Sequence, residues 1–211
     1  MISVLLATRN GDKFEIIKDL LLTLVSCSMS FSSPDTEGCS RELVEEGCVV
    51  DRARSKAHAH LGCCGFGKTL VVGSDDAFRI PDYFGNEIRC DSEQITELII
   101  NGKILPGTPV YLVRSFWCIE NIPLQGAELG SVEQGCVTEI PFKYLGGIIS
   151  GGPTKLLHKT YPLSMVLGQI ARDVPVAQDD PGQLRLYYSS HSEELRSVLL
   201  SLPSFKNFKL N

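Results

Sequence analysis

The sequence predicts an α/β fold, because short apolar strands alternate with amphipathic helices along the chain. The first strand is expected over 2–7, and a polar turn over 8–12 leads from it into an amphipathic helix over 13–24. A second buried strand over 70–73 ends in Ser74-Asp75-Asp76. Polar groups that follow a strand in this way lie where α/β proteins place their functional sites.

The other elements follow from hydrophobic periodicity and from the residues that favour turns. Neither an internal repeat nor a long linker interrupts the chain, so 1–211 is expected to form one domain. In chain order we expect a strand over 27–31, a loop over 32–40, a helix over 48–61, a short helix over 93–100, two antiparallel strands over 110–119 and 123–132 joined by a turn at 120–122, a helix over 154–172 that Pro162 kinks, and a last helix over 192–202.

Composition and charge exclude some classes of protein. The net charge is −5, and duplex nucleic-acid binders carry a basic stripe, so a nucleic-acid partner is not expected. The longest early apolar run, 16–25, contains Lys18 and Asp19, so we expect neither a membrane span nor a secretory signal. We therefore expect a cytoplasmic protein.

Eight cysteines occur, none of them in a C-x-x-C pair. Without an export signal such thiols are expected to stay unpaired and to act as small apolar side chains. Paired ligands at short spacing are also missing, which argues against a zinc site.

The segment 62–69 fits the phosphate-binding pattern G-x-x-x-x-G-K-[ST]. That motif works between a strand and a following helix, whereas here a helix precedes the segment and a strand follows it. We expect a glycine-rich connection that binds no phosphate.

Three segments carry groups suited to phosphate or metal. The turn over 8–13 offers a hydroxyl, a carboxamide and an ammonium, Asp75-Asp76 offers two carboxylates, and His158-Lys159 lies in the expected late helix with Lys155 one turn earlier. Each has an ordinary alternative: a capped helix start, a solvated turn and an exposed helix face.

In their order along the chain these segments resemble the inosine triphosphate pyrophosphatases, which hydrolyse noncanonical purine nucleoside triphosphates. The segment 7–13 (A-T-R-N-G-D-K) resembles the T-x-N-x-x-K opening of that family, and 51–57 (D-R-A-R-S-K-A) resembles its E-N-A-x-x-K-A helix. Ser74-Asp75-Asp76 stands at the A-D-D-S-G motif, and His158-Lys159 at the H-R of S-H-R. The ordered resemblance covers about 1–172.

The resemblance implies a long mixed β-sheet flanked by helices, with two lobes around a central cleft, in a homodimer. It implies Mg²⁺-dependent hydrolysis of inosine or xanthosine triphosphate to monophosphate and pyrophosphate. Asp76 and Lys13 would be catalytic, and Glu46 or its neighbour Glu45 would bind Mg²⁺ together with Asp76. The implied substrate-binding residues are Thr8, Asn10, Lys13, Lys56, His158 and Lys159.

Departures from the family pattern leave two alternatives open. Ala77-Phe78 replaces the S-G of A-D-D-S-G, Leu157 and Lys159 replace the Ser and Arg of S-H-R, and no G-F-G-Y-D-P segment is recognisable. One alternative is a pyrophosphatase of the same fold that acts on another nucleotide. The other is a nucleotide-binding protein that has lost catalysis.

Overall fold

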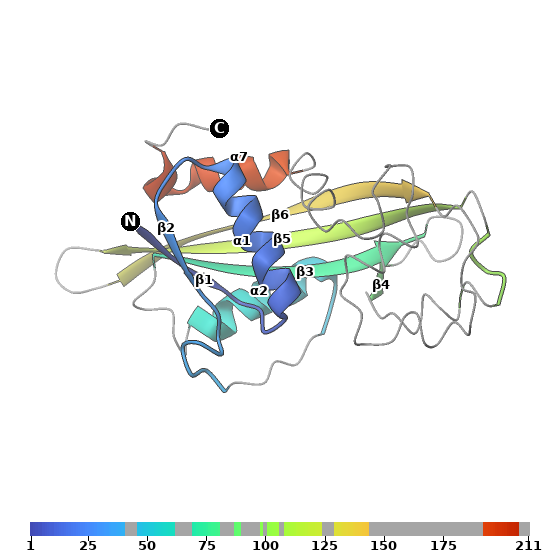
Figure 1. Cartoon of the computed structure of the whole chain (residues 1–211), viewed down its shortest axis with the longest axis horizontal. Coiled ribbons are helices and arrows are strands. Elements are labelled where there is room, and N and C mark those ends of the chain that lie inside the picture. Colours follow the sequence, from blue (N-terminus) through green and yellow to red (C-terminus); the bar gives the residue numbers. More distant parts are fainter. Residues whose placement is uncertain are drawn as a thin grey trace. The chain divides into compact units, whose positions relative to one another are not determined.

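The computed structural model describes residues 1–40, 46–61, 69–80, 87–89, 98, 101–105, 108–123, 129–143 and 192–206. Within these residues the strands form a sheet in the order β2-β1-β3-β5-β6, and β4 pairs with β3 outside this path. Figure 1 shows this arrangement. The elements are β1 (Ile2–Leu6), α1 (Gly11–Leu24), β2 (Met29–Ser32), α2 (Val49–His60), β3 (Leu70–Arg79), β4 (Glu87–Arg89), β5 (Pro109–Pro123), β6 (Leu129–Lys143), α7 (Glu193–Ser201) and the short 3₁₀ helix η2 (Pro203–Phe205).

The sheet is mixed, as expected. β1 is parallel to β2 and to β3, whereas β4 runs antiparallel to β3. The parallel register aligns Val4 of β1 with Leu70 of β3, and Leu6 with Val72. Strands buried on both faces read as nearly continuous apolar runs, which explains why β1 was recognisable from sequence. The predicted α/β class with a mixed sheet and flanking helices is confirmed.

Both faces of the sheet carry a hydrophobic core. One core joins β1, β3 and β5 to α1, α7 and η2, with Phe116 and Phe205 among its largest fully buried side chains. The other core is smaller and brings Leu5, Val71 and Ile119 against Ala57 of α2. Because neighbouring residues of a strand point to opposite faces, Val71 belongs to the α2 core and Val72 to the α1 core.

Two strands extend beyond their predicted ends. β3 continues past Gly73 to Arg79, so Asp75 and Asp76 lie inside the strand. β5 continues through the predicted turn at 120–122 and ends at Pro123. The polar residues that suggested a turn have specific partners: buried Glu120 accepts hydrogen bonds from the backbone N–H and the hydroxyl of Ser204.

The chain divides into two compact units. The first comprises Met1–Asp75, Arg114–Thr138 and Ser189–Asn211, and the second comprises Asp76–Val113 and Glu139–Tyr188. In the second unit β4 pairs with β3, and Arg79 stacks over the ring of Tyr111 and forms an ion pair with Glu139. In the part of the chain that the structure describes, no helix is long and apolar enough to cross a membrane.

Candidate functional site

The turn between β1 and α1 is shorter than predicted, because α1 begins at Gly11 and not at Lys13. The Asn10 carboxamide oxygen accepts a hydrogen bond from the backbone N–H of Lys13 at 2.9 Å, which caps α1. The Thr8 hydroxyl oxygen accepts one from the backbone N–H of Asn10 at 3.2 Å. Asn10 is exposed, whereas Thr8 and Lys13 are half-buried. A helix start of this kind directs unpaired backbone N–H groups and a partial positive charge toward solvent, which suits an anion.

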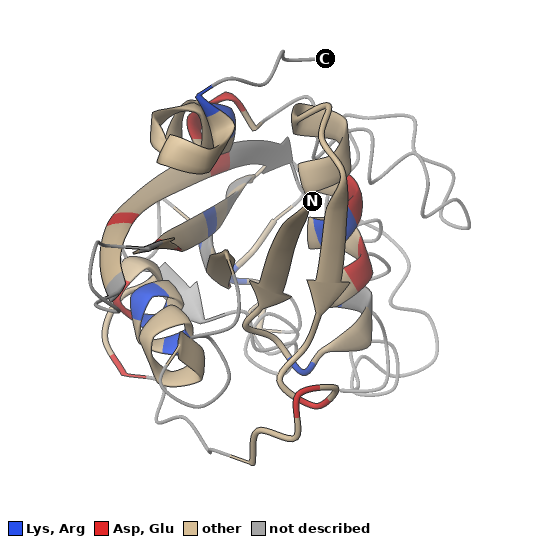
Figure 2. Ribbon diagram, turned by 90° about the vertical axis from the view of Figure 1, so that its left-hand side faces the viewer, with Lys and Arg blue, Asp and Glu red and all other residues tan. Residues whose placement is uncertain are grey.

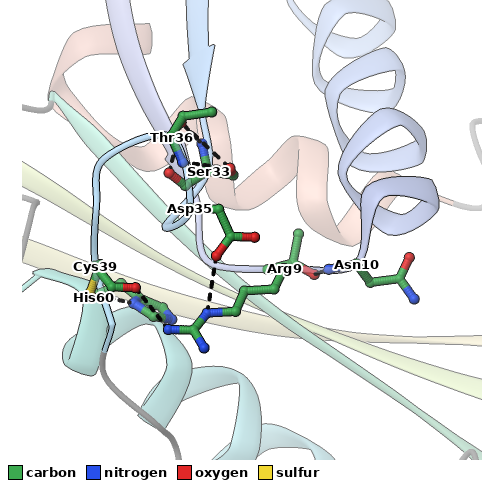
Figure 3. Close-up of polar contacts among 8 residues, drawn as sticks. Arg9, Asn10, Ser33, Asp35, Thr36, Cys39 and His60 are labelled. Carbon is green, nitrogen blue, oxygen red and sulfur yellow. Dashed lines mark hydrogen bonds and ion pairs between the residues drawn. The ribbon is translucent and has the colours of Figure 1, made fainter.

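A second loop is fastened to this turn through Arg9. Its guanidinium donates a hydrogen bond to the carbonyl of Cys39 at 2.8 Å and forms an ion pair with Asp35 at 3.4 Å. Figure 3 shows Arg9 reaching from the turn toward both residues of the loop that follows β2. The loop therefore supports the turn that carries Asn10.

Cys39 corrects the expectation that all eight cysteines are unpaired. It is disulfide-bonded, to a residue outside the described ranges, and its sulfur lies 3.5 Å from Nδ1 of His60 in a buried environment (Figure 3). Four others in the described ranges, Cys27, Cys48, Cys118 and Cys136, are free, as predicted. The argument that the thiols stay unpaired because no export signal is recognisable therefore fails at Cys39.

Asp75, the neighbour of the predicted site residue Asp76, binds two cations of α2. One of its oxygens accepts a hydrogen bond from Nε of Arg52, and the other accepts one from Nζ of Lys56 at 2.5 Å. The exposed fractions of the three side chains are 9% for Asp75, 6% for Arg52 and 14% for Lys56. Lys56, predicted to bind phosphate, thus lies on the carboxylate of Asp75.

The pairing follows from the local sequence of α2 and β3. Arg52 and Lys56 are four residues apart, so they share one face of the helix. That helix packs unusually close to the strand, because a Cβ placed on Gly73 would lie 2.1 Å from the carbonyl oxygen of Ala53. Gly73 and Asp75 both point toward α2, as the two-residue period of a strand requires. The arginines and the lysine of α2 are blue in Figure 2.

Asp76 points to the other face of β3. By strand alternation it shares the face of Val72, whereas Asp75 shares the face of Gly73. The exposed fraction of Asp76 is 5%, so this residue is buried and belongs to a strand, not to a solvated turn. The two adjacent aspartates therefore have different surroundings, and both oxygens of Asp75 are already bound to cations. The predicted approach of Asn10 and Lys13 to Asp76 stays a prediction.

The turn before α2 carries Glu46, which is exposed. Gly47 follows it with a φ of +81°, a left-handed conformation that favours glycine. The carbonyl of Gly47 accepts a hydrogen bond from Nη1 of Arg52 at 2.7 Å. Asp51 closes the helix start by accepting hydrogen bonds from the side chain and the backbone N–H of Cys48, which lower the pKa of Asp51. The turn that holds Glu46 is therefore fixed to α2.

The outer face of α2 is fastened to β5 and β6. The carboxylate of Glu133 accepts hydrogen bonds from Nε1 of Trp117 at 2.8 Å and from Arg54 at 3.3 Å, and its oxygen lies 2.7 Å from Nε2 of His58. The Arg54 guanidinium also lies 5.0 Å above the Trp117 ring. These contacts hold the helix that carries Arg52 and Lys56 in place.

Several predicted site residues lie outside the described ranges: Glu45, His158 and Lys159, together with Lys155 and most of the segment 62–69. The elements around that segment are α2 before it and β3 after it, as expected. Among the described residues no group of three or more His, Cys, Asp or Glu side chains could hold a metal. Mg²⁺ often uses only one or two carboxylates plus substrate oxygens, so Asp76 and Glu46 remain chemically suitable.

Sequence reasoning assigned no role to Arg52, although its signal was present. Two cations four residues apart on one helix face, opposite a carboxylate of a buried strand, indicate a buried ion pair. Glu133 and Trp117 gave no comparable signal, because their contacts join segments far apart in the sequence.

The fold of this chain is similar to that of proteins of known structure. A nucleoside-triphosphatase, or dITP/XTP pyrophosphatase, of Mycobacterium abscessus ATCC 19977 superposes with a TM-score of 0.52 at 14% identity, over 96% of this chain and 99% of that one. A HAM1 protein of Coxiella burnetii superposes with a TM-score of 0.55 at 16% identity, over 96% and 100%. This chain has their fold. No protein-family model matches the sequence, and no curated protein matches it significantly.

Proposed function

We propose that this protein hydrolyses noncanonical purine nucleoside triphosphates of the inosine and xanthosine type to monophosphate and pyrophosphate. The observation that carries the proposal is the fold shared with a dITP/XTP pyrophosphatase over nearly the whole of both chains. The capped turn at Asn10 and the buried Asp76 stand at the positions where the sequence resembles that type of enzyme.

In the proposed reaction the phosphates bind at the start of α1. Hydrogen bonds and positive charge come from the uncapped N–H groups of the first turn, the side-chain NH2 of Asn10 and the ammonium of Lys13. The Thr8 hydroxyl stabilises the turn by accepting a hydrogen bond from the backbone N–H of Asn10. Lys56 adds a second ammonium from α2. Such donors accelerate hydrolysis because they offset the charge that develops on phosphate oxygens in the transition state.

Asp76 is the proposed general base and, with Glu46, a proposed ligand of Mg²⁺. Water attacks the α-phosphorus and gives a proton to the Asp76 carboxylate. The bond between the α-phosphorus and the oxygen that bridges it to the β-phosphate breaks, and pyrophosphate leaves with that oxygen. Bound Mg²⁺ would neutralise charge on the phosphate oxygens. Asp75 is not assigned to this role, since Arg52 and Lys56 occupy both of its oxygens.

The proposal includes a homodimer in the cytoplasm. His158 and Lys159 would close over the base or the α-phosphate. If turnover is found only with another nucleotide, the same-fold alternative replaces this substrate. Triphosphate binding without pyrophosphate release would favour the alternative of lost catalysis, which the Ala77-Phe78 replacement motivates.

The proposal is tested by Asp76→Asn, which conserves size and removes a base. We expect pyrophosphate release from inosine triphosphate with Mg²⁺ to fall by about two to four orders of magnitude, as loss of a general base commonly causes. Asp19→Asn on α1 is a matched control with the same change outside the proposed site. If the wild type is active and Asp76→Asn keeps more than half of its rate at unchanged melting temperature, the assignment is wrong.

A further inference from the structure

Among the residues that the structure describes, one nitrogen of the Arg52 side chain has no hydrogen-bond partner. Arg52 uses Nε for Asp75 and Nη1 for the carbonyl of Gly47, but its Nη2 is buried and unpaired. The side chain is only 6% exposed. A buried donor left unpaired destabilises the fold, and more so when it is charged, so Nη2 is expected to have a hydrogen-bond acceptor as its partner.

The chemistry of Nη2 restricts what that occupant can be. A guanidinium only donates and keeps its charge at every physiological pH, so its partner must be an acceptor. Phosphate oxygens pair well with an arginine whose plane is already fixed. Here the carboxylate of Asp75 and the carbonyl of Gly47 hold that plane from two sides.

The position of Arg52 also favours a phosphate. Lys56, a proposed phosphate ligand, lies one helical turn along the same face and binds the other oxygen of the same carboxylate. Arg52 stands at the Asn of the E-N-A-x-x-K-A pattern, so this cation is a feature of the present chain.

We propose that Arg52 is a phosphate-binding residue, anchored by Asp75 and Gly47, whose Nη2 donates to an oxygen of the substrate's phosphate chain. The inference rests on the proposed function for its substrate class. It adds a binding group on α2 and makes Asp75 a positioning residue for two cations.

The test measures binding of inorganic triphosphate by calorimetry, because this probe has the phosphates and no base. Arg52→Lys keeps the positive charge but loses the planar set of N–H donors. Arg52→Met removes both the charge and the donors. Arg54→Lys and Arg54→Met are matched controls on the same helix, since Arg54 is exposed and pairs with Glu133. We expect both Arg52 variants to bind at least about tenfold more weakly, whereas the Arg54 variants bind as the wild type does.

Steady-state kinetics separate a binding role from a purely structural one. With inosine triphosphate, folded Arg52→Lys is expected to raise KM about tenfold while its kcat stays near that of the wild type. Triphosphate affinity and KM that are unchanged in folded Arg52→Lys would overturn the inference and leave an ordered water as the partner of Nη2. That result would not touch the proposed function, which fails instead if the wild type releases no pyrophosphate.

Discussion

Asp75 and Asp76 are adjacent in sequence, but their side chains lie on opposite faces of β3 and have different surroundings. Strand alternation turns Asp75 toward α2, where two cations bind it, and turns Asp76 toward the opposite face. The sequence identified the pair and the cap at Asn10, because local patterns signal both. It could not divide the roles of the aspartates, since that division depends on α2, which lies about twenty residues earlier in the chain.

At this scale Asp75→Asn is expected to lower the free energy of unfolding by about 3–5 kcal/mol, because it removes the carboxylate that buried Arg52 and part-buried Lys56 share. Urea denaturation measures the change. Asp35→Asn is the control, since the exposed pair between Asp35 and Arg9 is worth at most about 1 kcal/mol. An Asp75→Asn protein as stable as the Asp35→Asn protein would contradict the buried pairing.

At the scale of the elements, α2 is held from two sides. Its inner face lies against β3 at Gly73, and its outer face is bound to Glu133 of β6. Sequence patterns placed α2 and the start of β3 well. They missed the length of β3 and β5, because polar residues that usually mark a turn are here paired with distant partners such as Ser204.

The inner contact predicts the effect of Gly73→Ala. The new Cβ would lie 2.1 Å from a carbonyl oxygen of α2, so the helix must move away from the strand. We expect a loss of about 3 kcal/mol in the free energy of unfolding, measured by thermal and urea denaturation. Gly11→Ala is the control, since a Cβ there meets nothing within 4 Å. Equal stability of the two variants would contradict the close packing of α2 on β3 at Gly73.

The contact between α2 and Glu133 predicts that the stability of the fold depends on pH. The hydrogen bond from Trp117 is the main cause that lowers the pKa of Glu133, with smaller contributions from His58 and Arg54. A lowered pKa means that the carboxylate stabilises the fold above its unfolded pKa of about 4.3, and that this stabilisation is lost as pH falls through the folded pKa.

We therefore expect Glu133→Gln to cost about 1 kcal/mol at pH 7, a modest value because the side chains are partly exposed. The difference from the wild type should shrink toward zero as pH falls below 4. Glu139→Gln on the same strand is the control, since Glu139 pairs with Arg79 and not with α2. A difference that is constant from pH 3 to pH 7 would show that the charge of Glu133 is not involved.

For the molecule as a whole, the order of motifs predicted the fold better than any single motif did. The turn at Asn10, the helix with Lys56 and the strand with Asp76 occur in the order that the resemblance requires, and the structure has the corresponding fold. The disulfide of Cys39 was not predictable, because disulfide pairing depends on which residues meet in space.

The central claim is that this chain cleaves noncanonical purine triphosphates between the α- and β-phosphates. The most direct measurement is a product analysis with purified wild-type protein and Mg²⁺, in which monophosphate and pyrophosphate are quantified for inosine, xanthosine and the four common triphosphates. The account predicts equal amounts of the two products, formed much faster from inosine and xanthosine triphosphate than from the common ones. Release of inorganic phosphate together with nucleoside diphosphate, or no turnover of any of these nucleotides, would contradict it.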